Sequence, residues 1–185
     1  MIVAQNKKKE NIAEYLLYMW QVEDLIRANH FDIDAIRQTV ISRYEQPEEI
    51  KQDIARWYEK LIHMMRTEGV MEKGHLQIHK DVITDLTDCH THLLQSPEEM
   101  LYNATYDRTL PYIVQLRAKS GGNDLPELET CFTAVYGYFM LKMQGKEVSA
   151  TTEEAIRQVA AFLALLAARH KEKSFGESIK IEETL

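Results

Sequence analysis

Near its N-terminus the chain reads Asn11-Ile-Ala-Glu-Tyr-Leu-Leu-Tyr-Met-Trp-Gln-Val-Glu-Asp-Leu-Ile-Arg27. On a helical wheel at about 100° per residue, its apolar side chains cover more than half of the circumference. A helix that lies on a protein surface has a narrower apolar stripe, so this width indicates packing on several sides. The stretch therefore predicts a central helix in an all-helical domain, with Trp20 buried.

Six further helical segments follow, with no convincing strand between them. Their limits are set by start and stop signals: Asp32 or Asp34 as an N-cap, Pro47 as a first helical residue, Gly69 as a helix end, and a capping box that begins at Thr151. The seven predicted helices cover residues 8–29, a segment after 32 or 34, 47–69, 75–95, a segment that starts at 96, 126–144, and a segment that starts at 151.

Apolar residues at helical spacing predict which faces of two of these helices are buried. In the segment that opens with Pro47 the buried stripe is Ile50, Ile54, Trp57, Leu61 and Met64. In residues 126–144 the apolar residues occupy almost the whole circumference of the helix, and they include Phe132, Val135, Tyr138, Phe139 and Met140. Gly137 in the middle of that helix predicts a close helix crossing, because glycine costs about 1 kcal/mol relative to alanine there.

Pro111 interrupts the segment that starts at residue 96, and predicts either a kink or two short helices. The clearest loop is Ser120-Gly121-Gly122-Asn123, which offers a boundary between two subdomains. However, the two apolar helices after it have too much apolar surface to be covered alone. We therefore expect one all-α domain over residues 1–173, a single bundle of six or seven helices with one kinked at Pro111, and a frayed tail over residues 174–185.

Composition excludes several classes of protein. The chain has 185 residues, of which 45% are hydrophobic and 28% are charged, as in an ordinary globular protein. Its formal charge of −7 argues against a nucleic-acid partner, which requires a basic face. No apolar run reaches the roughly 20 residues of a membrane span. Two cysteines without metal or redox spacing and no secretion signal predict a cytoplasmic protein without a membrane partner.

Helices with apolar faces this wide also predict self-association. In a small bundle, the outermost apolar arcs lie open to water unless a partner covers them. We expect a homodimer, since two-fold dimers are the commonest oligomers, and a different protein partner is a further option. The alternative is a monomer whose helices wrap a single core.

Glu23 is a candidate binding residue because it falls in the middle of the apolar face formed by Ile12, Leu16 and Met19. A carboxylate in that position is costly unless it has a partner. Arg27 lies four residues later, in the favourable order of acid before base, and predicts an ion pair with Glu23 at a helix–helix contact. The functional alternative is a buried acid that transfers protons or binds a ligand.

Three histidines, His75, His79 and His90, lie on the apolar side of the predicted helix 75–95. His75 and His79 are one turn apart and are weak candidates for metal ligands, whereas His90 lies about 16 Å further along the axis. A third ligand would have to come from another helix, and the sequence names none. Hydrogen-bonded core histidines are the simpler interpretation, and no metal or cofactor is predicted.

A second group of candidate binding residues, Tyr102, Tyr106 and Asp107, lies beside Pro111. Polar aromatic residues next to a proline kink can line a cleft. The simpler interpretation is that these tyrosines border the core with their hydroxyls in water.

The stretch Asn11-Ile-Ala-Glu-Tyr-Leu-Leu-Tyr-Met-Trp-Gln-Val-Glu-Asp24 resembles the opening of a family of proteins from Bacteroides-type bacteria that is catalogued as a domain of unknown function. The resemblance implies a bacterial, all-helical protein and carries over no functional residue.

Two classes of function remain after these exclusions. The first is a non-enzymatic intracellular interaction or scaffold protein that self-associates through apolar helix faces. The alternative is a small-molecule-binding or metal-dependent helical-bundle enzyme that uses Glu23, His75 and His79, or the region around Tyr106 and Asp107. A pocket where those residues converge on an acid or histidine with a shifted pKa would favour the alternative.

Overall fold

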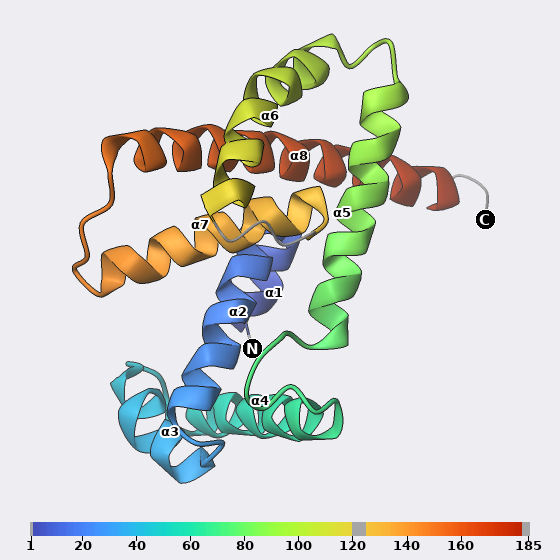
Figure 1. The fold of residues 1–185 in the computed structure, drawn as a ribbon. Coiled ribbons are helices and arrows are strands. Elements are labelled where there is room, and N and C mark those ends of the chain that lie inside the picture. Colours follow the sequence, from blue (N-terminus) through green and yellow to red (C-terminus); the bar gives the residue numbers. More distant parts are fainter. Residues whose placement is uncertain (1, 120–124, 183–185) are drawn as a thin grey trace. The chain divides into compact units, whose positions relative to one another are not determined.

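A computed structural model describes residues 2–119 and 125–182, with side chains for 3–119 and 125–173. These residues form eight α-helices and one short 3-10 helix, without a strand in the described ranges (Figure 1). The prediction of an all-α protein is confirmed, and the number of helices is slightly higher than six or seven. The predicted loop Ser120–Asn123 lies outside the described residues.

Two compact units share these helices. Unit 1 comprises residues 1–10 and 14–82, and unit 2 comprises residues 11–13 and 83–185. The division therefore falls inside the helix α5 (Gln77–Gln95) rather than at the glycine loop considered from the sequence. The single domain over residues 1–173 and the tail over 174–185 stay predictions.

The N-terminal helical region contains a break that the sequence interpretation missed. Instead of one helix from residue 8, the chain forms α1 (Ile2–Glu10) and α2 (Ile12–Ala28). Asn11 separates them, and its side-chain oxygen accepts a hydrogen bond from the Ala13 amide at 3.0 Å. An asparagine in this position caps the start of a helix, so α2 begins where its first amides find an acceptor.

Helix α2 is packed on nearly every side, as predicted. Within the helix only Glu14 and Ala28 are exposed, and the buried apolar residues include Leu16, Trp20 and Ile26. Burial of this width cannot come from a single neighbouring helix.

In unit 1 the chain then forms α3 (Ile33–Thr39), the 3-10 helix η1 (Ile41–Arg43) and α4 (Glu48–Thr67). Asp32 is the N-cap of α3, since its carboxylate accepts from the amides of Asp34 and Ala35. Pro47 precedes the first helical residue of α4, and the helix ends before Gly69, which has a positive φ of 70°.

The buried face of α4 is rotated slightly about the helix axis relative to the predicted face. Ile54 and Leu61 are buried as expected. However, Ile50, Trp57 and Met64 are only half-buried, and the other buried residues are Ala55, Tyr58, Ile62 and Met65.

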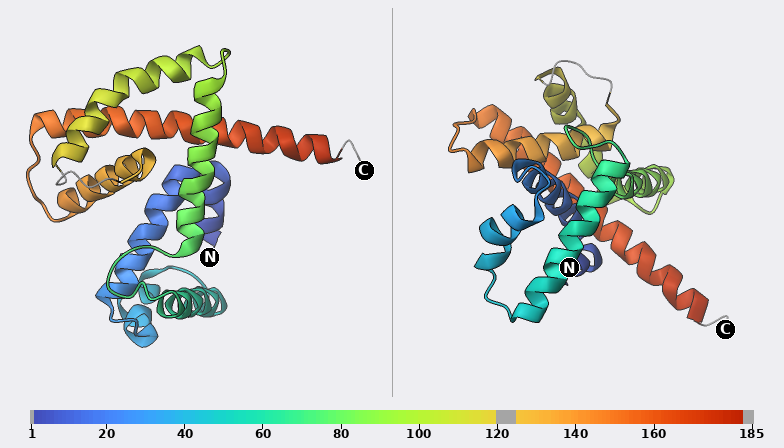
Figure 2. Two further views of the ribbon diagram at one scale, coloured as in Figure 1. Left: turned by 45° about the vertical axis from the view of Figure 1, so that its right-hand side comes forward. Right: turned by 90° about the horizontal axis from the view of Figure 1, so that it is seen from below.

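Unit 2 contains the end of α5 together with α6 (Met100–Lys119), α7 (Glu127–Met143) and α8 (Ala150–Glu182). Helix α6 continues through Pro111 as one helix, and its ribbon bends along its length, so the alternative of two short helices is wrong. Both α6 and α7 pack on α8, which is the longest helix (Figure 2).

Two predictions for α7 are wrong. A Cβ built on Gly137 meets nothing within 4 Å, so this glycine does not mark a close helix crossing. The first half of α7 buries Leu128, Cys131 and Phe132, but Phe139, Leu141 and Met143 in the second half are exposed. The apolar residues of α7 are therefore covered at one end only.

Helix α8 starts at Ala150, one residue earlier than predicted, and its capping residue lies two residues earlier. Ser149, rather than Thr151, lies at its start, because the Thr152 amide donates to both the carbonyl and the hydroxyl of Ser149. The helix continues to Glu182, beyond the predicted start of the tail.

Among the described residues, no helix combines the length and the apolar content that crossing a membrane requires. Cys89 and Cys131 are both free and buried.

Candidate functional site

Glu23 is the buried acid that the helical wheel of α2 predicted. Its side chain has 0% exposure and lies on the same face as Leu16 and Met19, which are buried as well. A carboxylate in such surroundings is stable only if donors replace the water it has lost.

Three donors from the start of α5 surround the Glu23 carboxylate. The Nδ1 atom of His75 lies 2.6 Å from one oxygen, and the Nδ1 atom of His79 lies 2.5 Å from the other. The backbone amide of Leu76 donates to the second oxygen at 3.1 Å. The Leu76 carbonyl accepts a hydrogen bond from the Lys80 amide, so Leu76 is the N-cap residue of α5. Glu23 thus lies at the positive end of α5, where a negative charge is favoured.

These contacts determine the ionisation of Glu23. Burial by itself raises the pKa of the carboxyl, but the hydrogen bonds from His75 and His79, the charge of His79 and the Leu76 amide lower it further. The net result is a pKa of about 2. Glu23 is therefore ionised throughout the physiological pH range.

Aromatic rings hold both histidines in place. The indole of Trp20 stacks on His75 with 4.0 Å between ring centroids and 7° between planes. The ring of Tyr15 meets His79 edge-on, with 6.1 Å between centroids. His79 is fully buried, and its Nε2 atom has no hydrogen-bond partner among the described residues. Each imidazole thus forms a hydrogen bond from Nδ1 to Glu23, and this bond fixes the orientation of the ring.

Arg27 has different partners from the one predicted. Its guanidinium pairs with Asp24 at 2.7 Å and donates to the carbonyls of Val70, at 3.0 Å, and Gly74. The expected ion pair with Glu23 is thus replaced by contacts to the segment that joins α4 to α5. Together, Glu23 and Arg27 fasten that segment to α2, and the observed contacts of both residues are structural.

The histidine pair was also a weak candidate for metal ligands. The Nδ1 atoms of both residues face Glu23. Within residues 2–119 and 125–182, no group of three or more His, Cys, Asp or Glu side chains is arranged to hold a metal ion.

A second polar cluster lies inside unit 2 and includes two of the predicted site residues. The hydroxyl of Tyr102 lies 2.7 Å from Nδ1 of His90, and Nε2 of His90 lies 3.9 Å from an oxygen of Glu127. Tyr106 also hydrogen-bonds to Glu127, and Phe162 of α8 packs edge-on against His90. Tyr102 has 0% exposure, so the expectation that its hydroxyl meets water is wrong.

Burial controls the ionisation of this cluster. It lowers the pKa of His90, against the opposing effect of Glu127. Burial also raises the pKa of Tyr102 and Tyr106 well above the ordinary value for a phenol. The three rings are therefore held in their neutral forms at neutral pH, as expected for a polar network inside a core.

The observed cluster differs from the sequence interpretation at two residues. Asp107 is exposed on α6 and lies outside the hydrogen bonds of the cluster, although its charge adds to the raised pKa of Tyr106. Glu127 was missed, although its position directly after Pro126, as the first residue of a helix, was visible in the sequence. Its partners were not, because they lie on two other helices.

The exposed apolar residues of α7 continue a buried face of the same helix. Phe132, Val135, Phe139 and Met143 lie within about 80° of one another on the helical wheel, and we call them the α7 stripe. Phe132 has 0% exposure and Val135 is half-buried, but Phe139 is 39% and Met143 is 68% exposed. The stripe therefore emerges from the core of unit 2 without a cover at its C-terminal end.

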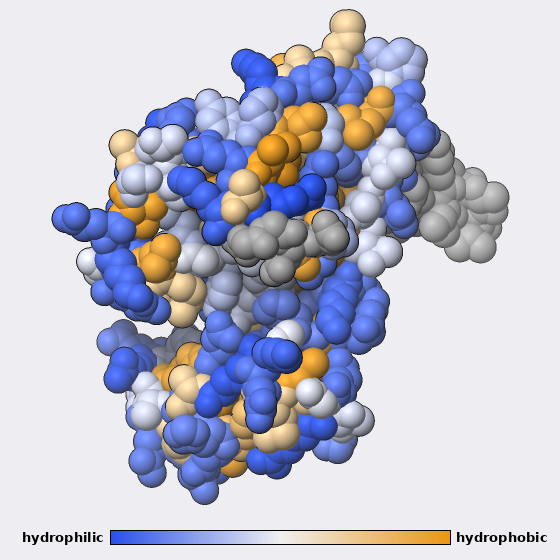
Figure 3. Space-filling view, viewed as in Figure 1, coloured by the Kyte–Doolittle hydropathy of each residue, from blue (hydrophilic) through white to orange (hydrophobic). Residues whose placement is uncertain are grey.

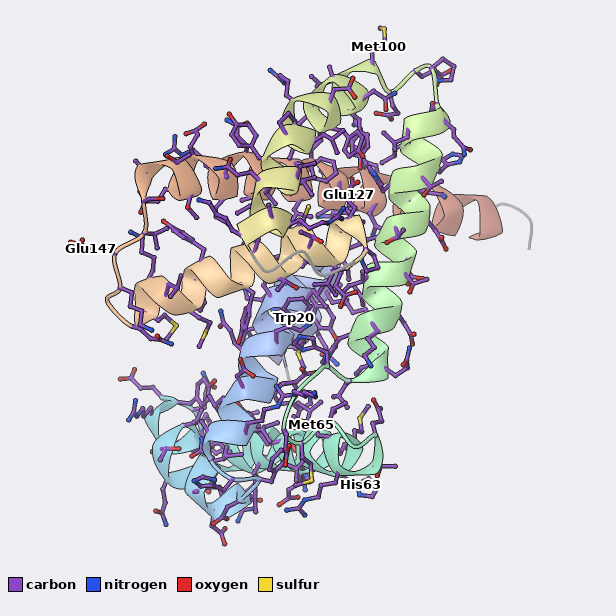
Figure 4. The ribbon with its side chains drawn as sticks, in the orientation of Figure 1. Trp20, His63, Met65, Met100, Glu127 and Glu147 are labelled. Atoms are coloured by element: carbon purple, nitrogen blue, oxygen red, sulfur yellow. The ribbon has the colours of Figure 1, made fainter. Side chains whose placement is uncertain are left out.

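Other apolar side chains also reach the surface of unit 2 (Figure 3). On α6, Met100 and Leu101 are adjacent, and Leu110 and Val114 lie one turn apart. Met100 at the start of α6 is 76% exposed and projects away from that helix (Figure 4). Exposed apolar residues in small groups of this kind are common in proteins. The α7 stripe differs because it extends a buried surface.

Comparison with known proteins agrees with the resemblance of the N-terminal residues. The model of a family described as "Domain of unknown function (DUF4924)" matches residues 1–177. The curated proteins and the solved structures give no significant match.

Proposed function

The chain belongs to the family DUF4924, and we propose that this member is a non-enzymatic interaction protein that self-associates through the α7 stripe. One observation carries the proposal: a helix face that is fully buried at Phe132 is left uncovered at Phe139 and Met143. Covering apolar side chains of this size contributes about 25 cal/mol for each Å² removed from water. A second copy supplies the same stripe, so a two-fold contact places apolar residues against apolar residues.

The charges beside the stripe favour a second copy as the partner. Lys142 is adjacent to Met143 and pairs with Glu153 at 2.6 Å within the same chain. A two-fold contact presents the same residues from both chains, and residues near its axis lie close to their own equivalents, where unpaired like charges would repel. Because Lys142 is already paired, it can lie at the polar edge of such a contact.

The buried acid supports a structural role rather than catalysis. Glu23 has 0% exposure, and donors of the chain itself occupy both carboxylate oxygens. A catalytic acid has to reach its substrate, directly or through water. The cavity between α6, α7 and α8 and two cavities of unit 1 beside the start of α4 are lined by other residues.

Sedimentation equilibrium of the full chain tests the proposal. We expect a mass of twice 21.6 kDa at micromolar concentrations. Met143→Glu is expected to weaken the dimer about a hundredfold or more, because the contact would then bury an unpaired carboxylate from each chain. Met100→Glu changes another exposed methionine, on α6, and serves as the matched control that leaves the mass unchanged.

A monomer at high concentration would contradict the proposal. So would a dimer that Met100→Glu dissociates and Met143→Glu does not. Circular dichroism of each variant shows whether the helices are intact.

A further inference from the structure

Unit 2 contains a cavity of about 240 Å³ between α6, α7 and α8. Most of its wall is apolar and includes Leu116, Ala134, Leu141, Val148 and Ile156. An apolar cavity of about 150 Å³ holds benzene in another protein, so this one has room for about ten non-hydrogen atoms.

Gly137 forms part of the wall and accounts for some of the space. A Cβ at this position would meet nothing within 4 Å, so the absence of a side chain is not required by close packing. Glycine inside a helix is destabilising relative to alanine. The cavity provides a reason for glycine here, since any longer side chain at residue 137 would fill it.

Among the residues that the structure describes, Lys119 is the only charged one in the cavity wall. Its ammonium group donates to the hydroxyl of Thr152 at 2.7 Å and forms no ion pair among the described residues. A lysine ammonium has three donors, so at least one remains for an anion at the rim.

We propose that this cavity binds a small amphipathic carboxylic acid in its ionised form, with the carboxylate at Lys119 and the hydrocarbon chain over Gly137. Medium-chain fatty acids match both requirements, because octanoate has about ten non-hydrogen atoms and a single negative charge. The site goes beyond self-association and is independent of it. On α7, Phe139 and Met143 lie about 200° and 240° round the helix from Gly137, away from the cavity.

Titration of the full chain with octanoate, followed by two-dimensional amide NMR, tests the proposal. We expect saturable shifts at the amides of Gly137 and Thr152, with one ligand per chain. Octanol is the neutral control, and we expect it to bind about fivefold more weakly because it cannot pair with Lys119. Equal binding of the two ligands would overturn the assignment of the carboxylate.

Three variants locate the site. Lys119→Met is expected to weaken octanoate about fivefold and to leave octanol unchanged. Lys146→Met removes an exposed lysine outside the cavity and should change neither ligand by more than about twofold. Gly137→Leu should abolish binding of both ligands, because its side chain occupies the cavity. Lys119 is exposed, so the test does not depend on whether Gly137→Leu folds.

Shifts that gather at Phe139 and Met143 instead of Gly137 would show that octanoate coats the α7 stripe, and would overturn the proposal. The absence of saturable shifts at millimolar octanoate would do the same. Neither result bears on self-association, which is measured without ligand.

Discussion

At the scale of single residues, Glu23 shows how unit 1 keeps a charge inside its core. The carboxylate is fully buried, yet its pKa is about 2, because His75, His79 and the Leu76 amide together outweigh the effect of burial. Glu23 therefore joins α2 to the start of α5 through charge-assisted hydrogen bonds, which are stronger than neutral ones.

Replacing Glu23 tests this role. We expect Glu23→Gln to lower the free energy of unfolding at pH 7 by about 3 kcal/mol, since the amide cannot accept from all three donors. Urea unfolding of Glu23→Gln and of Glu14→Gln measures the effect. Glu14 is an exposed acid on the same helix, and its replacement should cost less than about 0.5 kcal/mol.

The pH dependence of that difference follows from the lowered pKa. A carboxyl group whose pKa is depressed in the folded state stabilises the protein above its unfolded pKa. For Glu23 the contribution is complete above about pH 5 and is lost as the pH falls from 4.5 towards 2. A difference between wild type and Glu23→Gln that stayed constant across this range would contradict the assignment.

Trp20 provides a test of α2 as a central helix. Its side chain is 2% exposed and stacks on His75. We expect Trp20→Ala to lower the free energy of unfolding by 3–5 kcal/mol, as is typical of a buried aromatic residue. Trp57→Ala is the matched control and should cost less, because Trp57 is half-buried. A loss for Trp20→Ala no larger than that for Trp57→Ala would contradict the central position of α2.

At the scale of secondary-structure elements, the positions of helix ends depend on single polar side chains. Asn11 separates α1 from α2, and Ser149 lies at the start of α8. The sequence interpretation predicted no cap at Asn11, and for α8 it selected a cap of the right chemical type, Thr151, two residues later than the observed one. Local signals of this kind compete over a few residues, and tertiary packing selects among them.

The break at Asn11 leads to a specific prediction. Asn11→Ala removes the acceptor of the Ala13 amide and should lower the free energy of unfolding by about 1 kcal/mol. Thermal unfolding followed by circular dichroism measures the change. Because alanine favours helix, a stabilised variant would mean that α1 and α2 fuse and that the cap does not hold the break.

At the scale of the whole molecule, the sequence predicted the all-α class and the burial of α2, because apolar periodicity records both. It also placed Glu23, His75 and His79 on apolar faces. It could not pair them, since Glu23 lies 52 residues from His75, and the neighbour one turn away, Arg27, was the obvious partner. The contact between His90 and Glu127 could not be predicted from a single sequence for the same reason.

Gly137 and the α7 stripe show the same limit for apolar residues. The wheel of α7 identified its apolar positions, but the neighbouring helices decide which of them are covered. Phe132 is buried and Phe139, two turns later on the same face, is exposed. The uncovered end of this face is the basis of the proposed self-association.

The most direct test of that proposal is isotope-filtered NMR on an equal mixture of chains labelled at the methionine methyl groups and unlabelled chains. We predict intermolecular contacts from the Met143 methyl, and none from Met65, which is fully buried, or from Met100, which is exposed on α6. Contacts absent at Met143 in a sample at millimolar concentration would contradict the account.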